Sequence, residues 1–266
     1  MNVASIDQLG NEIIVPKGLL RIVSLVPSQT ELLFDLGLEE EVVGVTRFCI
    51  HPEEKVSQKA IIGGTKNFDM ELIHELSPNL IIGNKEENYQ DGVNELRKRY
   101  PVWMSDIYNL HDAYSMMSGI GAITGRQKEA EMLIQELKSG FSQLATINSP
   151  RPATCAYFIW RKPYMVAAQG TFIEHMIGIL GMKNVFGTLE RYPELSAGDI
   201  ADARPDVIFL SSEPYAFRDK HIAEFKQICP NARVEIVDGE LFSWYGSRLR
   251  HTAAYFAALR ESIGLH

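Results

Sequence analysis

Cysteine is scarce in this chain, and long apolar runs are missing. The three cysteines, Cys49, Cys155 and Cys229, are widely separated and odd in number, so they predict neither a disulfide framework nor a paired-cysteine metal site. We expect them to be buried as small apolar side chains. No apolar run approaches the roughly 20 residues that span a bilayer. The net charge of −8 and the lack of a basic stripe argue against nucleic-acid binding.

A secretory leader is not visible at the start of the chain. The first residues, Met1-Asn2-Val3-Ala4-Ser5, contain no basic segment followed by an apolar one. Two interpretations stay open at this point. The chain is cytoplasmic, or it is a mature form from which a leader has been removed.

Common catalytic motifs are also missing. The chain has no G-x-S-x-G turn, no phosphate-binding G-x-x-x-x-G-K-[ST] loop and no H-E-x-x-H pair. Glu86 and Glu87 are neighbours in a segment expected to be extended, so they point in opposite directions and do not form an acid pair. Cys49 and His51 have side chains that bind metals, but no third ligand has a known position. We expect no catalytic residues.

What the chain does contain is a widely spaced repeat. The segment from Pro78 to Glu86 resembles the segment from Pro205 to Glu213, 127 residues later. Each copy predicts a helix that ends at proline, a short apolar strand, and a glutamate where the strand ends. Solenoid repeats have periods of roughly 20–50 residues, so this spacing instead predicts two similar lobes.

Strands alternate with helices in both halves, which is typical of parallel α/β units. Ser28–Glu31 and Thr171–Glu174 have the S/T-x-x-E pattern of a helix start. Residues 110–147 lack strand signals and have helical apolar spacing. We therefore predict an α/β protein with two Rossmann-like lobes and mostly parallel sheets, covering residues 1–108 and 150–266. One long rigid helix over 109–149 is expected to join them.

Ligands of parallel sheets bind beyond the carboxyl ends of the strands. The loops expected there are rich in aromatic, arginine and glutamate side chains, which suit a large, flat, partly apolar ligand. An aromatic residue after a strand can also belong to the core, but several such loops favour binding. The candidate ligand-binding residues are Arg47, Phe48, Glu86, Tyr89, Trp160, Arg161, Tyr164, Glu213, Tyr215, Trp244, Tyr245 and Arg248.

Several motifs together resemble a known family. They include Arg21-Ile22-Val23-Ser24-Leu25-Val26-Pro27-Ser28, Leu76-x-Pro78-Asn79-Leu80-Ile81-Ile82 and Arg204-Pro205-Asp206-Val207-Ile208. With them, nearly the whole chain is similar to the substrate-binding proteins of ABC importers for cobalamin and ferric chelates. The resemblance implies two lobes bridged by a rigid backbone helix, limited hinge closure and no chemistry. It also implies a periplasmic or membrane-anchored extracytoplasmic location.

The resemblance further implies partners. In this family an acidic residue on each lobe docks against arginines of the permease dimer. Glu71 matches the first position, whereas the second is Gly198, with Asp199 or Glu194 as substitutes. The protein is expected to be a monomer without a cofactor of its own, and its ligand is expected to be a cobalt or iron complex.

The identity of the ligand stays open between three kinds. Aromatic clefts suit cobalamin, a tyrosine or histidine on iron suits haem, and arginines suit anionic siderophores; we favour a corrinoid or other tetrapyrrole. The alternatives to transport are a cytosolic chelatase-like enzyme that handles tetrapyrroles or metals, and a metal sensor. Cys49 and His51 are the candidate metal ligands for those alternatives.

Overall fold

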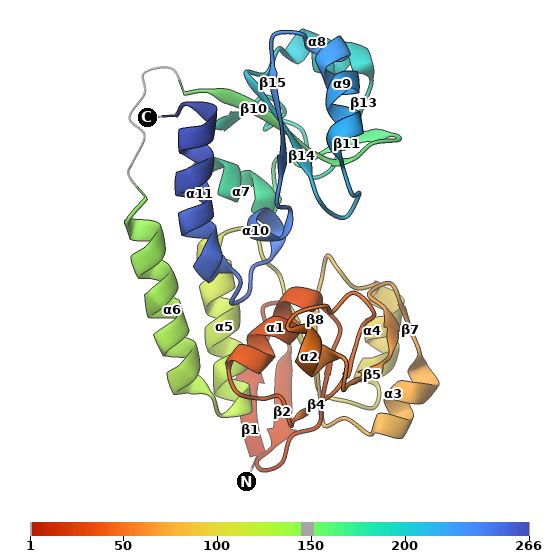
Figure 1. The fold of residues 1–266 in the computed structure, drawn as a ribbon. Coiled ribbons are helices and arrows are strands. Elements are labelled where there is room, and N and C mark those ends of the chain that lie inside the picture. The colour runs from red at the N-terminus through yellow and green to blue at the C-terminus, as the bar shows by residue number, and fades with distance from the viewer. Residues whose placement is uncertain (1, 145–151, 266) are drawn as a thin grey trace. The chain divides into compact units, whose positions relative to one another are not determined.

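A computed structural model describes residues 2–144 and 152–265, and it divides the chain into two compact units (Figure 1). Unit 1 comprises Met1–Lys138 and Tyr245–Arg248, and unit 2 comprises Ser139–Trp244 and Leu249–His266. Most of the helical segment after residue 108 thus belongs to unit 1, whereas the sequence predicted a separate linker over 109–149. The predicted end of that linker, at residues 148–151, lies outside the described residues. No helix in the described part of the chain is long and apolar enough to cross a bilayer.

Unit 1 contains a parallel sheet of five strands in the order β5-β4-β3-β8-β9. The first of these strands in the chain, β3, is central, so the strand order reverses beside it. In such a sheet, loops diverge at the carboxyl ends of the two strands at the reversal and leave room for a ligand. The strands are β3 (Ile22–Ser24), β4 (Val42–Val45), β5 (Ala60–Ile61), β8 (Leu80–Asn84) and β9 (Val102–Ser105).

Five helices, the first part of a sixth and two small hairpins complete the described part of unit 1. The chain begins with an antiparallel hairpin, and a second hairpin of two-residue strands follows β5. The helices are α1 (Pro27–Asp35), α2 (Glu53–Val56), α3 (Met70–Leu76), α4 (Gln90–Arg97) and α5 (Leu110–Thr124). The hairpins are β1 (Asn2–Ile6) with β2 (Glu12–Pro16), and β6 (Gly63–Gly64) with β7 (Asn67–Phe68).

The predicted connecting segment is helical, but it is divided into two helices. Gly125 adopts a left-handed conformation (φ 74°) and caps α5, because glycine tolerates positive φ without a steric penalty. The second helix, α6 (Gln127–Ser142), crosses from unit 1 into unit 2 after Lys138. The expectation of one long helix missed this break.

Unit 2 is built on a mixed sheet. Its core strands β10, β14 and β15 are parallel, and β12 also runs parallel to β10. Strand β12 pairs with the start of β10 on the edge opposite β14, and β11 pairs with the end of β10 on that same edge. Strands β11 and β13 are antiparallel to their neighbours. The strands are β10 (Thr154–Trp160), β11 (Tyr164–Val166), β12 (Lys183–Asn184), β13 (Glu194–Leu195), β14 (Val207–Ser211) and β15 (Arg233–Val237).

Aromatic side chains pack the core of unit 2. Phe158, Phe217 and Phe225 are buried within one cluster together with aliphatic residues of β10 and β14, and the rings of Phe158 and Phe225 lie 4.7 Å apart. The helices of this unit are α7 (Phe172–Ile179), α8 (Ala197–Ala203), α9 (Asp219–Ile228), α10 (Glu240–Ser243) and α11 (Leu249–Ile263).

The repeat in the sequence corresponds to a repeat in the backbone. Helices α3 and α8 have seven residues each, and both end at a left-handed residue with φ 47°, Ser77 and Arg204. Proline follows in each case, and then the five-residue strands β8 and β14 begin. This agreement confirms the predicted helix–proline–strand unit in both halves.

Two predicted helix starts have different outcomes. Helix α1 begins at Pro27 with Val26 as its N-cap, so Ser28 lies inside the helix and caps nothing. Proline is favoured at the first helical position, and the helix therefore starts two residues earlier than the S/T-x-x-E pattern predicted. Thr171 does cap α7 by accepting from Glu174 N, but the Glu174 carboxylate binds Asn184 instead of closing the box. A full capping box, which the sequence analysis missed, starts α8 at Ser196 and Asp199.

Candidate ligand-binding surfaces

The loop after β4 presents an exposed aromatic ring beside a cation. Phe48 is 53% exposed, and the Arg47 guanidinium lies 5.7 Å from the centre of its ring. Gly64 allows the β6–β7 hairpin to pack close by, since a Cβ there would lie 3.3 Å from both side chains. Arg47 also donates a long hydrogen bond of 3.4 Å to the side chain of Asn67. One N–H group of Arg47 is used in this bond, and a guanidinium carries five donors that suit an anionic group.

The residues that follow Phe48 do not resemble a metal site. Cys49 is buried, and its sulfur lies 3.1 Å from Thr30 Oγ1 and 3.3 Å from Thr46 Oγ1. Burial raises the pKa of this thiol, which opposes formation of the thiolate that binds metals. His51 is half-buried. Within the described residues, no group of three or more histidine, cysteine, aspartate or glutamate side chains is arranged to hold a metal ion.

Buried asparagines fasten the loop after β8. Asn84 Oδ1 accepts from the backbone N–H groups of Glu86 and Glu87. Asn88 Oδ1 accepts from Asn84 N at 2.9 Å, and Asn88 Nδ2 donates to the carbonyls of Leu25 and Thr65 at 3.1 Å each. The half-buried Glu86 therefore occupies a rigid turn at the carboxyl edge of the sheet.

Tyr89, another candidate, has a packing role in unit 1. Its ring lies 4.8 Å from that of Phe68. It also covers Gly92, where a Cβ would lie 2.1 Å from the tyrosine ring. The ring is half-buried, so only part of it is available to a ligand.

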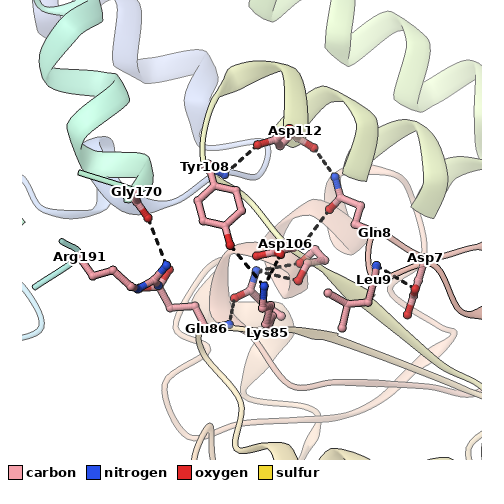
Figure 2. A network of polar contacts seen from close by, with 12 residues as sticks. Asp7, Gln8, Leu9, Lys85, Glu86, Asp106, Tyr108, Asp112, Gly170 and Arg191 are labelled. Carbon is pink, nitrogen blue, oxygen red and sulfur yellow. Dashed lines mark hydrogen bonds and ion pairs between the residues drawn. The ribbon is translucent and has the colours of Figure 1, made fainter. Parts of the chain in front are cut away.

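Three polar residues at the same edge were not among the predicted site residues, although Lys85 was expected in the loop after β8. Lys85 Nζ lies 2.6 Å from Asp106 Oδ2 and 3.4 Å from the Tyr108 hydroxyl (Figure 2), and the bond to Asp106 is the main reason why the pKa of Lys85 is raised. The apolar run Val102–Ser105 could have revealed β9, after which Asp106 and Tyr108 follow.

The same network connects the end of the first hairpin to this edge. Gln8 accepts from Asp106 N and donates to the Asp112 carbonyl, while Asp112 Oδ2 accepts from Tyr108 N (Figure 2). These contacts fix the β9–α5 loop in unit 1. In unit 2, Figure 2 also shows Arg191, which donates to the Gly170 carbonyl at 3.2 Å.

In unit 2 an aromatic surface lies at the end of β10. Trp160 is 39% exposed, and its ring packs edge-on at 5.5 Å against Tyr215 from the loop after β14. The Tyr215 hydroxyl lies 3.3 Å from His221 Nε2. Because His221 Nδ1 accepts from Arg218 N, the ring proton of a neutral His221 is on Nε2 and points at Tyr215.

Arg161 and Tyr164 share one carboxylate. Arg161 Nε lies 2.7 Å from Glu224 Oε2, and the Tyr164 hydroxyl donates to Glu224 Oε1. Burial acts to raise the pKa of Glu224, but the bonds from Tyr164 and Arg161 outweigh it and lower the pKa. Burial, together with the bond to Glu224, raises the pKa of Tyr164 to about 12. The Arg161 guanidinium is therefore partly neutralised.

Glu213 and Trp244 are bound to each other in unit 2. Glu213 Oε1 accepts from Trp244 Nε1 at 3.0 Å and from Ser243 Oγ at 2.7 Å. Burial raises the pKa of Glu213. Trp244 is only 7% exposed, so it offers a ligand little surface in this structure.

Tyr245 and Arg248 belong to unit 1. Tyr245 is also only 7% exposed. Arg248 forms a two-pronged ion pair with Glu31 of α1, with distances of 2.9 Å and 2.7 Å. The predicted roles of these residues in binding remain predictions.

The candidate docking residues lie in or just before the first turns of the corresponding helices α3 and α8. Glu71 is exposed in the first turn of α3, and Gly198 is its counterpart in α8. Asp199 is exposed but is held by Ser196, whose N–H and hydroxyl bind Asp199 Oδ2 at 2.8 Å and 2.7 Å; this contact lowers the pKa of Asp199. Glu194 lies in the edge strand β13 and is exposed.

Most of the chain matches a known protein family. A family profile described as periplasmic binding protein matches residues 22–227. The chain belongs to the periplasmic binding protein family. This membership confirms the resemblance inferred from the sequence motifs, and it identifies a family of substrate-binding proteins for transport rather than a family of enzymes.

Individual relatives agree with this assignment. The ABC transporter substrate-binding lipoprotein YvrC of Bacillus subtilis is 24% identical over 257 residues, which cover 92% of this chain and 81% of the relative. The vitamin B12-binding protein of Vibrio cholerae is 24% identical over 199 residues, covering 74% and 72%. The apo structure of the periplasmic haem-binding protein RhuT from Roseiflexus superimposes with a TM-score of 0.78 at 21% identity, covering 92% of this chain and all of the other. The last likeness confirms the two-lobed α/β fold.

Proposed function

We propose that this chain is the substrate-binding component of an ABC importer and that its ligand is a metal tetrapyrrole, cobalamin or haem. Membership of the binding-protein family carries the first part. The names of the relatives, one for vitamin B12 and one for haem, support the second part, because both ligands are large macrocycles around a metal ion.

The carboxyl edges of the two sheets support a flat, partly apolar ligand. Unit 1 presents Phe48 beside Arg47, and unit 2 presents Trp160 beside Tyr215. Phe48 and Trp160 are exposed although both are large and apolar, so the cores of the units do not require them there. Aromatic rings bind planar macrocycles by stacking, and the Arg47 guanidinium suits an acidic side group of the macrocycle.

The remaining partners follow from the family. We propose that the protein acts outside the cytoplasm, as a periplasmic or lipid-anchored protein, and that it delivers its ligand to a permease dimer. Glu71 is the proposed contact of unit 1 with the permease, and Asp199 or Glu194 that of unit 2. The protein is expected to act as a monomer.

Binding measurements test the proposal. Cyanocobalamin, haemin and a ferric hydroxamate are each titrated into the purified protein, with calorimetry and tryptophan fluorescence as readouts. We expect micromolar or tighter binding of a tetrapyrrole, and Phe48→Ala or Trp160→Ala to weaken it about tenfold, as expected from the loss of roughly 1–2 kcal/mol of aromatic contact. Met132→Ala removes a side chain that is 66% exposed on α6 and serves as the matched control, with unchanged affinity.

Two results would overturn the proposal. Calorimetry without heat for all three ligands would contradict a role in their capture, and tight binding of the hydroxamate alone would contradict the tetrapyrrole assignment. Metal insertion into a free porphyrin would instead favour the chelatase-like alternative.

A further inference from the structure

The chain passes between the two units at a second place besides α6. It leaves unit 2 after Trp244, contributes Tyr245–Arg248 to unit 1, and returns to unit 2 at Leu249, where α11 begins. We call residues 243–248 the crossing segment. A short excursion of this kind is not needed to join α10 to α11, since both helices belong to unit 2.

In unit 1 the crossing segment is held by charge and by close backbone packing. Arg248 and Glu31 form their two-pronged pair with side chains that are only 16% and 13% exposed. Such pairs are stronger and more directional than single ion contacts. Gly246 lies against the first turn of α1, where a Cβ would approach the Ser28 carbonyl oxygen to 2.3 Å. The next residue, Ser247, is fully buried.

In unit 2 the crossing segment is held by Glu213. The carboxylate accepts from Ser243 and from the Trp244 indole. Glu213 belongs to the loop after β14, which places this anchor at the carboxyl edge of the second sheet. On the return side, Thr252 of α11 donates to the Leu241 carbonyl of α10 at 3.1 Å, so both ends of the excursion are fixed in unit 2.

We propose that the crossing segment is a tether with one anchor in each unit, and that it limits the motion of the units independently of α6. Only Tyr245, Gly246 and Ser247 separate the anchored residues Trp244 and Arg248. Four residue steps extend over at most about 14 Å, so the units can separate at this place only within that length while both anchors hold. This inference does not depend on the identity of the ligand.

Distance measurements between spin labels test the tether in the ligand-free protein. The native cysteines are replaced by alanine, and labels are attached at Glu75→Cys on α3 and Asp202→Cys on α8, both exposed. With the tether intact, we expect one narrow distance distribution. In Arg248→Ala the width should increase roughly twofold, because the crossing segment is then fixed only in unit 2 and its extended length of about 14 Å no longer limits the separation of the units.

Further variants separate the tether from a general loss of structure. Gly246→Ala and Glu213→Ala should broaden the distribution as Arg248→Ala does, whereas Arg233→Ala, which breaks an exposed ion pair with Glu235 within unit 2, should not. Circular dichroism verifies that each variant is folded, and Glu31→Gln replaces Arg248→Ala if the latter unfolds. The charge swap Glu31→Arg with Arg248→Glu should restore the narrow distribution. Equal widths in the parent protein and in all folded anchor variants would overturn the proposal.

Discussion

Asn88 allows the sharpest prediction, because one buried side chain holds three backbone groups of unit 1. Its side chain accepts from Asn84 N and donates to the carbonyls of Leu25 and Thr65. Asn88→Ala removes all three bonds. Each is worth about 0.5–1.5 kcal/mol net, and a buried group left without a partner costs about 1–3 kcal/mol. The three lost bonds at about 1 kcal/mol each give an expected loss of about 3 kcal/mol.

Urea unfolding followed by circular dichroism measures the loss, and amide exchange of the peptide that contains Asn84 measures its location. We expect a lower midpoint with an unchanged slope, and faster exchange at Asn84 before any change in β3. Asn67→Ala is the matched control, since Asn67 is exposed and its bond to Arg47 is long; it should change stability by less than about 0.5 kcal/mol. If Asn88→Ala costs no more than this control, the argument that Asn88 fastens the edge of the sheet is wrong.

Three further predictions concern single groups. Burial raises the folded-state pKa of Glu213 above the ordinary value of 4.5, so the folded state binds this proton more tightly and the free energy of unfolding falls as the pH rises from 4.5 through the raised pKa. Glu213→Gln should lack this fall in urea unfolding, and the same pH dependence of the unfolding free energy in both proteins would contradict the argument. Ser77→Gly and Arg204→Gly should each stabilise by about 0.5 kcal/mol in thermal unfolding, because glycine relieves the left-handed strain but also increases the entropy of the unfolded chain, and a destabilisation of both would refute the strain argument. Cys49 and Cys155 are buried with raised pKa values, so a thiol reagent at pH 8 should label them slowly in the native protein and fully in urea; rapid native labelling would show that the buried positions are wrong.

The order of strands and helices was largely predictable from the sequence. The apolar runs around Ile22 and Ile81, and the two prolines after αL residues, are local signals that packing does not override. The break at Gly125 was also visible, as a glycine that follows a helical pattern, yet the apolar spacing continues on both sides of it and hid the break. Local patterns thus predicted which elements form but were less reliable on where they begin and end.

The candidate site was predictable in composition but not in pairing. The sequence places Arg161, Glu213 and Arg248 after strands, where a ligand is expected. It does not reveal their partners, because these are distant along the chain: Glu224 for Arg161, Trp244 for Glu213, and Glu31 for Arg248 at a separation of 217 residues. Whether an arginine is available to a ligand depends on such tertiary pairs. Among the three candidate arginines, the structure shows an ion pair with a carboxylate for Arg161 and Arg248.

The two units use the same backbone frame for different purposes. Asn84 and Ser211 both end a strand, and each side chain accepts from the backbone N–H two residues later, that of Glu86 or Glu213. Four residues after each strand end the units diverge, since Asn88 fastens the turn in unit 1 whereas Tyr215 in unit 2 packs against Trp160. A shared strand–turn geometry therefore supports a polar edge fastened by hydrogen bonds in unit 1 and an edge packed by aromatic rings in unit 2. Substitutions at the aromatic edge change fewer buried hydrogen bonds, so they are expected to cost less stability than substitutions at the fastened edge.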